Sequence, residues 1–166
     1  MPGTAQNNKT AKMNNNNRIA IDIRPATGAD SAAIVALDAE ITGTDKSAYW
    51  TDILERFTDS AMRIQRHFLV ASSANGDLVG FVVGEIRAWE FGSPPCGWVL
   101  ALSVSPQHRE LGIGSLLLDA LSVEFKAAGI ATIRTMVLST DKVNLSFFRG
   151  EGLSAGPYIE LEKRLD

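Results

Sequence analysis

The residues whose types and spacing most clearly suggest a chemical role lie in one segment, residues 102–115, which reads LSVSPQHRELGIGS. An apolar stretch ends at Val104, Pro106 turns the chain, and a helical pattern begins near Gly112. The first turn of a helix has backbone N–H groups without intrahelical partners and carries partial positive charge. Glycines at 112 and 114 leave that backbone uncovered, so the segment predicts a seat for a phosphate or pyrophosphate.

Two side chains would strengthen such a seat. Arg109 could make a charge-assisted contact, and the Ser115 hydroxyl could donate a hydrogen bond. The established phosphate loops do not fit: no Lys follows Gly114, which excludes a P-loop, and Leu117 takes the third glycine position of the dinucleotide pattern. By themselves, glycines in this position more often mark a plain strand-to-helix turn than a phosphate site.

Other reactive residues are few. The single cysteine, Cys96, follows two prolines and has no histidine in a recognisable motif, which favours a structural role. His108 lies in the glycine-containing loop, where it could touch a phosphate, but an exposed loop histidine is the ordinary alternative. No metal site is predicted.

Strands are indicated by alternation and by turn residues. Ile19, Ile21 and Ile23 alternate with polar residues, and Asn75-Gly76-Asp77 is a hairpin signal. Residues 97–104 are almost continuously apolar, as in a central strand covered on both faces. The predicted strands are residues 19–24, 67–72, 78–87, 97–104, 132–138 and 158–165.

Helices follow from apolar stripes at helical spacing. The clearest runs over residues 112–128, where Gly129 ends it. The others are a helix capped by Thr27 or Asp30 and ending near Ile41, one over residues 47–57, and a short one over residues 143–148. Residues 1–17 are Asn-rich and are predicted to be a disordered tail, with residues 18–166 forming one domain.

Composition narrows the function further. The chain has 166 residues and a net charge of −3, with no dense basic run, which argues against a nucleic-acid-binding protein. One cysteine allows no internal disulfide, and no segment is apolar enough for a secretory signal or a membrane span. These features predict a cytoplasmic protein with no membrane or nucleic-acid partner.

The loop and the second half of the chain resemble a known family. Val104-x-Pro106-x-x-Arg109-x-x-Gly112-Ile113-Gly114 is similar to the acetyl-CoA signature of the GNAT superfamily of N-acetyltransferases. Residues 139–153, ending Phe147-Phe148-x-x-x-Gly152-Leu153, resemble its second motif. The resemblance implies an α/β (α+β) acyl-CoA N-acyltransferase fold: one domain with a mostly antiparallel, V-shaped sheet of six to seven strands and about four helices.

The resemblance also implies acetyl-CoA as cofactor. Backbone N–H groups of residues 109–115 would hold the pyrophosphate, and the strand end at residues 102–104 would bond the pantetheine arm. Asp141 or Asn144 could bond the same arm, and Phe148 would pack beside it. The implied cofactor-binding residues are Leu102, Ser103, Val104, Arg109, Glu110, Leu111, Gly112, Ile113, Gly114, Ser115, Asp141, Asn144 and Phe148.

The implied reaction is direct attack of a primary amine on the thioester, with an oxyanion donor in a bulged backbone around residues 102–103. Two departures affect the chemistry. Phe148 stands where relatives often have a tyrosine acid, and Trp98 where some have a glutamate base. The candidate bases are therefore Glu85, Glu90 and Asp141, or a water chain; a solvated strand edge is the alternative for the two glutamates.

Three aromatic residues could bind the acceptor. Tyr49, Trp50 and Trp98 are predicted to line its pocket, although aromatics at helical spacing are also typical of a core. The leading hypothesis is an acetyl-CoA-dependent N-acetyltransferase acting on a small molecule, peptide or protein. The alternatives are a non-catalytic acyl-CoA-binding module on the same fold, or a loop that only turns the chain; the resemblance also suggests a homodimer.

Overall fold

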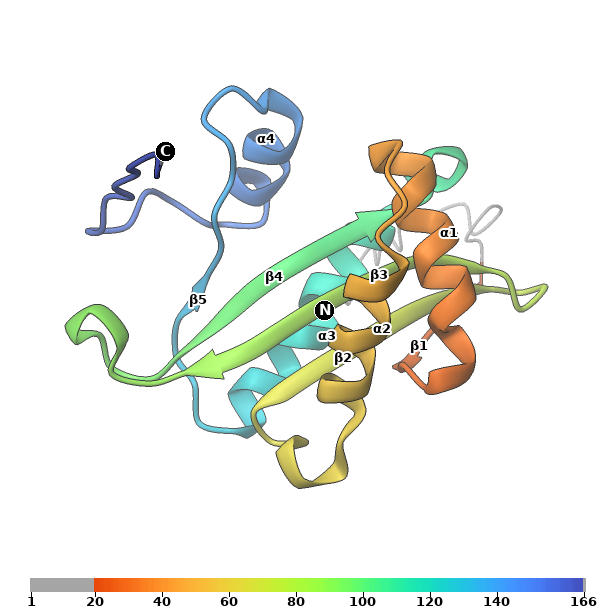
Figure 1. Cartoon of the computed structure of the whole chain (residues 1–166), viewed down its shortest axis with the longest axis horizontal. Helices are drawn as coiled ribbons and strands as arrows, with labels where there is room; N and C mark the ends of the chain where they lie inside the picture. The colour runs from red at the N-terminus through yellow and green to blue at the C-terminus, as the bar shows by residue number, and fades with distance from the viewer. Residues whose placement is uncertain (1–19, 166) are drawn as a thin grey trace, which may run out of the picture.

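A five-stranded sheet with helices on both faces organises the chain in the computed structural model, which describes residues 20–165 (Figure 1). The predicted tail, residues 1–17, lies outside the described residues. The strands are β1 (Ile21–Pro25), β2 (Arg66–Ser73), β3 (Leu78–Arg87), β4 (Cys96–Val104) and β5 (Ile133–Arg134), and the helices are α1 (Ser31–Thr42), α2 (Ser47–Thr58), α3 (Ile113–Ala127) and α4 (Lys142–Gly150).

The predicted architecture is confirmed, but the strand count is not. The described residues form five strands in the order β1-β2-β3-β4-β5 rather than six or seven. The expected strand over residues 132–138 is paired only at Ile133 and Arg134, and residues 158–165 form no strand. Both segments have strand-like alternation, but apart from Ile133 and Arg134 they pair with no strand, and alternation alone does not make a ladder.

The sheet is antiparallel except at its last pair. β4 pairs with β3 along its length, whereas it pairs with β5 in parallel only at Gly97↔Ile133 and Trp98↔Arg134. Beyond these pairs the chain after β5 turns away from β4, which produces the predicted V shape (Figure 1).

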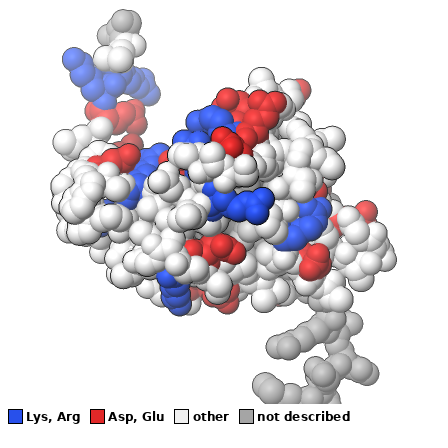
Figure 2. Space-filling view, turned by 90° about the horizontal axis from the view of Figure 1, so that it is seen from below, with Lys and Arg blue, Asp and Glu red and all other residues white. Residues whose placement is uncertain are grey.

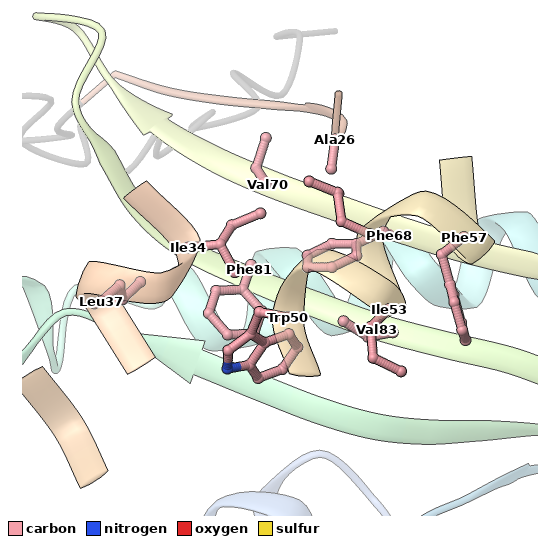
Figure 3. Close-up of a cluster of buried hydrophobic side chains, with 11 residues drawn as sticks. Ala26, Ile34, Leu37, Trp50, Ile53, Phe57, Phe68, Val70, Phe81 and Val83 are labelled. Atoms are coloured by element: carbon pink, nitrogen blue, oxygen red, sulfur yellow. The ribbon is translucent and has the colours of Figure 1, made fainter. Parts of the chain in front are cut away.

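One face of the sheet is covered by α1 and α2. Trp50 of α2 packs edge-on against Phe81 of β3, with ring centroids 5.0 Å apart, and against Phe68 of β2 at 6.1 Å (Figure 3). Ile34 of α1 is buried in the same cluster. The strand residues of this cluster alternate with those on the other face, as the pleat requires.

Helix α3 covers the opposite face at close range. Its buried residues include Ile113, Leu117 and Phe125. A Cβ at Gly97 of β4 would lie 2.4 Å from Phe125, so only glycine allows this helix to approach the strand so closely. The C-terminal end of α3 is thereby held close to β4.

The buried carboxylate of Asp30 stabilises the turn that leads from β1 into α1. Arg24 donates to Asp30 Oδ1 at 2.7 Å and to Oδ2 at 2.9 Å, and the Thr27 amide donates to Oδ2 at 2.8 Å. The hydrogen bonds from Arg24 are the main reason that the pKa of Asp30 falls from 3.8 to about 2, with burial opposing them.

Replacing this carboxylate should remove a pH-dependent part of the stability. Because the folded pKa of Asp30 is depressed, its contribution is complete above about pH 4 and is lost between pH 4 and about 2. Asp30→Asn should lower the free energy of unfolding by about 1–2 kcal/mol at pH 7, allowing for screening at the exposed Arg24. Denaturant unfolding at pH 7 and pH 3 measures the difference.

The control is Asp119→Asn, which removes an exposed carboxylate on α3. It should leave stability nearly unchanged at both pH values. An Asp30→Asn protein as stable as the wild type at pH 7 would contradict the assigned role of this ion pair.

Candidate cofactor site and acyl gap

The loop between β4 and α3 has a backbone that few sequences could adopt. A short 3-10 turn, Pro106–His108, follows the strand, and the chain then reaches Gly112 with φ 77°. Glu110 also has a positive φ, 64°, which for a residue with a side chain is worth about 1–3 kcal/mol of strain. Left-handed residues within a turn are typical of the backbone of an anion-binding nest.

The amides of this loop have no hydrogen-bond partner in the part of the chain from residue 20 to residue 165. Among the described residues, none of the backbone N–H groups from 109 to 115 donates to a backbone carbonyl outside the helix. Helix α3 begins at Ile113, so its own ladder starts only with Leu116 N–H donating to Gly112 O at 3.1 Å. A continuous run of free donors at a helix N-terminus is the geometry that binds a phosphate anion.

The phosphate seat, residues 109–115, is held in place by contacts with the core and with α1. Ile113 is buried under the sheet, and Gln107 Nε2 donates to Glu40 Oε1 of α1 at 2.7 Å. The sequence predicted that the Ser115 hydroxyl would bond the phosphate. In the structure this hydroxyl donates to Glu151 Oε1 at 2.5 Å. Ser115 therefore joins the first turn of α3 to the end of α4.

Beyond Trp98 and Arg134, β4 and the chain after β5 are no longer paired, and we call the space between these two segments the acyl gap. The side of β4 that borders this gap offers main-chain groups to it. Ser105 N–H donates to Val79 O of β3, so by alternation the amides of Leu102 and Val104 face away from β3, toward the gap. Ser103 instead directs its main chain to β3, opposite Phe81. The register places Leu102 and Val104, but not Ser103, where their backbone could bond a ligand in the gap.

The β-bulge of β4 does not lie where the sequence predicted. The expected position was residues 102–103, but Val83 pairs with Ala101 and Gly84 with Val99, which leaves Leu100 as the extra residue. Such a bulge interrupts the alternation, so consecutive N–H groups turn to the same side. The irregular backbone that could stabilise an oxyanion is therefore centred on Leu100.

Helix α4 flanks the gap through its aromatic residues. Phe147 and Phe148 pack at the edge of the α3-side core, and a Cβ at Gly114 would lie 3.1 Å from the Phe147 ring. Asp141 caps the helix, accepting from Asn144 N at 3.0 Å and Asn144 Nδ2 at 2.7 Å. Asp141 and Asn144 thus bond each other, and beside them a shallow hollow is lined by Lys142, Val143, Ser146, Phe147, Gly150 and Glu151.

The part of the sequence that forms this loop, strand pair and flanking helix matches a known family. The sequence model of the acetyltransferase (GNAT) family matches residues 33–152. The chain belongs to this family. The match spans every element that forms the seat and the gap.

Solved structures support the same fold. The acetyltransferase is similar to an aminoglycoside antibiotic 6'-N-acetyltransferase from Acinetobacter baumannii, with 14% identity, coverage of 89% of this chain and 100% of the other, and a TM-score of 0.74. A second aminoglycoside N-acetyltransferase, solved in complex with CoA, has 15% identity, coverage of 88% and 95%, and a TM-score of 0.76. A ribosomal-protein-alanine N-acetyltransferase from Brucella melitensis has 20% identity, coverage of 88% and 100%, and a TM-score of 0.68.

The candidate bases of the acetyltransferase occupy two different environments. Glu85 of β3 accepts from Arg87 Nε at 2.8 Å and lies 3.7 Å from Arg66 Nε. It pairs across the sheet with Trp98, the residue in the position of the family glutamate. Glu90 is exposed and lies 3.6 Å from Arg87 Nη1.

The three predicted acceptor-binding aromatics do not form one wall. Trp50 of α2 lies in the core, and its indole Nε1 is buried without a hydrogen-bond partner. Tyr49 is exposed and contacts Trp50 edge-on at 5.0 Å. Trp98 is half-buried, with the Arg87 guanidinium 5.7 Å from its ring.

Two residues that sequence reasoning missed close the narrow end of the V. Thr135 Oγ1 donates to Val99 O at 3.0 Å, bridging the strands where they begin to part. Arg134 Nη1 donates to the buried Ser93 Oγ at 2.7 Å and lies 3.6 Å from Cys96 Sγ. No local pattern distinguishes either residue from an ordinary strand residue.

The surface and hydropathy of the described residues agree with this picture. On the face shown in Figure 2, Lys and Arg side chains are interspersed with Asp and Glu rather than gathered in one patch. None of the helices between residues 20 and 165 combines the length and apolarity needed to cross a bilayer.

Placing a carboxylate at the nest should abolish CoA binding. Gly112→Glu introduces a Cβ at φ 77° with no atom within 4 Å, so the negative side chain would project into the space above the free amides. We expect affinity for CoA to fall by more than ~100-fold, measured by calorimetry, because like charges repel and the backbone is covered.

Gly129→Glu is the matched control. Gly129 has φ 79° and equally open surroundings, but it lies at the other end of α3. Both variants carry the same charge and similar backbone strain, so only a loss specific to Gly112→Glu supports the seat. Gly114 is a poorer test site because any side chain there also displaces Phe147.

Proposed function

We propose that this acetyltransferase moves an acetyl group from acetyl-CoA to a primary amine by direct attack of the amine on the thioester. The observation that carries the proposal is the run of free amides at residues 109–115 beside the splayed end of β4. The neighbours that act on aminoglycosides and on a protein alanine support an amine acceptor, in a small molecule, peptide or protein.

The residues present suit each part of the cofactor. The free amides of residues 109–115 and the exposed Arg109 would bind the pyrophosphate. The gap-facing main chain of Leu102 and Val104 would bond the pantetheine amides. This path leads the thioester to the bulge at Leu100, where a backbone N–H would stabilise the oxyanion that forms as the amine attacks.

Glu85 is the best-supported proton acceptor among the three candidates. It is the cross-strand neighbour of Trp98, so it supplies a carboxylate to the face where relatives carry theirs. Asp141 is committed to capping α4, and Glu90 lies beyond the end of β3. Glu85 would accept the proton of the attacking amine directly or through a water molecule.

The leaving thiolate has no side-chain acid nearby on α4. Phe148 packs against Phe147 with ring centroids 5.0 Å apart and has no proton to donate. Solvent entering the open gap would protonate the thiolate, which is a good leaving group.

We also place the protein in the cytoplasm, because its single cysteine is buried and needs no oxidising compartment.

Thiol release from acetyl-CoA in the presence of amines tests the proposal. A panel of polyamines, amino acids, aminoglycosides and peptide N-termini should include at least one amine that accelerates release and becomes acetylated. If the protein binds CoA but no amine in a broad panel is acetylated, the non-catalytic alternative is favoured instead.

Removing the proposed base should slow the reaction without blocking cofactor binding. Glu85→Gln should lower kcat by at least ~10-fold at neutral pH, and the loss should shrink as pH rises, because the amine then arrives deprotonated. Glu90→Gln, which also loses an ion pair to Arg87, is the control and should retain activity. An unchanged pH–rate profile in Glu85→Gln would exclude Glu85 as the base.

Restoring the missing hydroxyl tests the thiolate step. Phe148→Tyr should change kcat by less than about twofold if solvent already protonates the thiolate quickly. The measurement is kcat with a fixed acceptor, together with CoA affinity to show that α4 is undisturbed. A large increase in kcat would show that protonation by solvent limits the natural enzyme.

A further inference from the structure

Two buried carboxylates, Asp30 at the start of α1 and Asp38 within it, have very different partners. Arg24 and Thr27 together give Asp30 hydrogen bonds at both of its oxygens, the shortest at 2.7 Å. Asp38 is 5% exposed, yet the one hydrogen bond to its carboxylate among residues 20–165 comes from Lys46 Nζ, at 3.4 Å to Oδ1. Its Oδ2 accepts no hydrogen bond within the same residues. Because a buried charge is costly unless it is well paired, folding alone does not explain Asp38.

The Lys46 side chain contacts Asp38 without binding it firmly. Its ammonium lies 3.0 Å from Asp38 Oδ2, but this contact is not aligned as a hydrogen bond. The lysine side chain is 37% exposed and belongs to the link between α1 and α2, in which Gly43 has φ 71°. A lysine ammonium is strongly hydrated and is carried on a flexible stem. It can therefore move into water when another cation approaches the carboxylate.

An unpaired buried donor lies in the same region. The backbone N–H of Trp50 donates to Lys46 O at 3.0 Å, so the first turn of α2 connects Trp50 to the lysine beside Asp38. The indole Nε1 of Trp50 has no hydrogen-bond partner within the described residues, and it lies on the side of the ring away from Phe68 (Figure 3). The chain from residue 20 to residue 165 thus leaves one buried acceptor and one buried donor unpaired around the start of α2. Unpaired buried polar groups are characteristic of a site that binds a polar molecule.

This region lies over the strands that lead to the acyl gap. Trp50 packs on Phe81 of β3, with ring centroids 5.0 Å apart, and Phe81 pairs with Ser103 of β4. Leu100, the bulge residue, precedes Ser103 by three positions, a distance of about 10 Å along a strand. An acceptor whose amine meets a thioester at Leu100 would therefore place groups about 10 Å from that amine beside the first turn of α2.

We propose that Asp38 binds a second ammonium group of the acceptor and so makes this enzyme selective for diamines and polyamines. This inference rests on the proposed function, because that function places the reacting amine at Leu100. Lys46 fills the subsite when no acceptor is bound, and its primary ammonium has the chemistry that the subsite selects. The entering ammonium displaces Lys46 into solvent, and Trp50 Nε1 donates to a water or hydroxyl oxygen that enters with it. The second ammonium is favoured because a buried carboxylate attracts a cation more strongly than an exposed one does.

Calorimetry with the full chain saturated with CoA tests the subsite through two probes with the same number of carbons, hexamethylenediamine and hexylamine. The wild type should bind the diamine at least ~10-fold more tightly, because only the diamine brings a second cation to Asp38. Asp38→Asn keeps the shape of the side chain but removes its charge, so it should abolish this preference while CoA affinity stays unchanged. Equal binding of the two amines by the wild type, or a preference that survives Asp38→Asn, overturns the proposal.

The Lys46→Gln variant separates an acceptor subsite from a structural ion pair. Loss of the internal ammonium should raise the affinity for hexamethylenediamine by ~3-fold or more, because more of the protein then has an open subsite. Lys126→Gln, on an exposed residue at the end of α3, removes the same charge on the other face of the sheet and should change nothing. An unchanged or lower diamine affinity in Lys46→Gln would indicate a purely structural pair and would overturn the proposal. This sign alone decides the outcome if Asp38→Asn does not fold.

The binding measurements can fail independently of the proposed function. If no amine releases thiol from acetyl-CoA but the diamine preference and both variant effects are present, the subsite stands and the transfer reaction does not. If an amine is acetylated but the wild type shows no diamine preference, the transfer reaction stands and the subsite does not.

Discussion

Strand β4 is hydrogen-bonded to β3 from Cys96 to Val104, whereas it is bonded to β5 only at Gly97 and Trp98. From Leu100 to Val104 its outer edge is therefore backbone without a strand partner, where unpaired polar groups are normally avoided. Such an edge is tolerable when a ligand with amide groups can complete the ladder. The site exists because β5 leaves β4 early.

The early departure is stabilised by contacts at the closed end of the V. Arg134 reaches across to Ser93 and Cys96, and Thr135 bonds the Val99 carbonyl in place of a backbone partner. On the α3 side, Gly97 allows Phe125 to press against β4 at the same level. Because β4 and β5 are held together at one end of the V and separate toward the other, the N-terminus of α3, the free edge of β4 and the bulge face a common space.

Local features of this fold could be read from the sequence, and features that depend on pairing could not. The limits of α2 and α3 follow from apolar periodicity and from Gly129, and the β2–β3 turn follows from Gly76, which has φ 87°. The loop around Arg109, Gly112 and Gly114 and the start of α3 could also be predicted, because a helix N-terminus is a local structure.

The failures concern partners that lie far apart in the sequence. The alternation in residues 158–165 predicted a strand, but a ladder needs a second edge that no local pattern reveals. The bulge is at Leu100 rather than residues 102–103, because its position depends on the register with β3. The hydroxyl of Ser115 is bonded to Glu151, which is distant in sequence.

The chemistry that this site can perform rests mainly on backbone, which explains how Phe148 and Trp98 can occupy positions where relatives have reactive side chains. In the proposed function, free amides at residues 109–115 would hold the pyrophosphate whatever the side chains are, provided that Gly112 keeps its positive φ and Ile113 stays buried. A bulge amide stabilises an oxyanion without any titrating group. Because a thioester is already activated, orientation of the amine beside it can supply much of the acceleration. Side-chain acids and bases then adjust the rate and its pH dependence, and the geometry of β4 determines whether the reaction occurs.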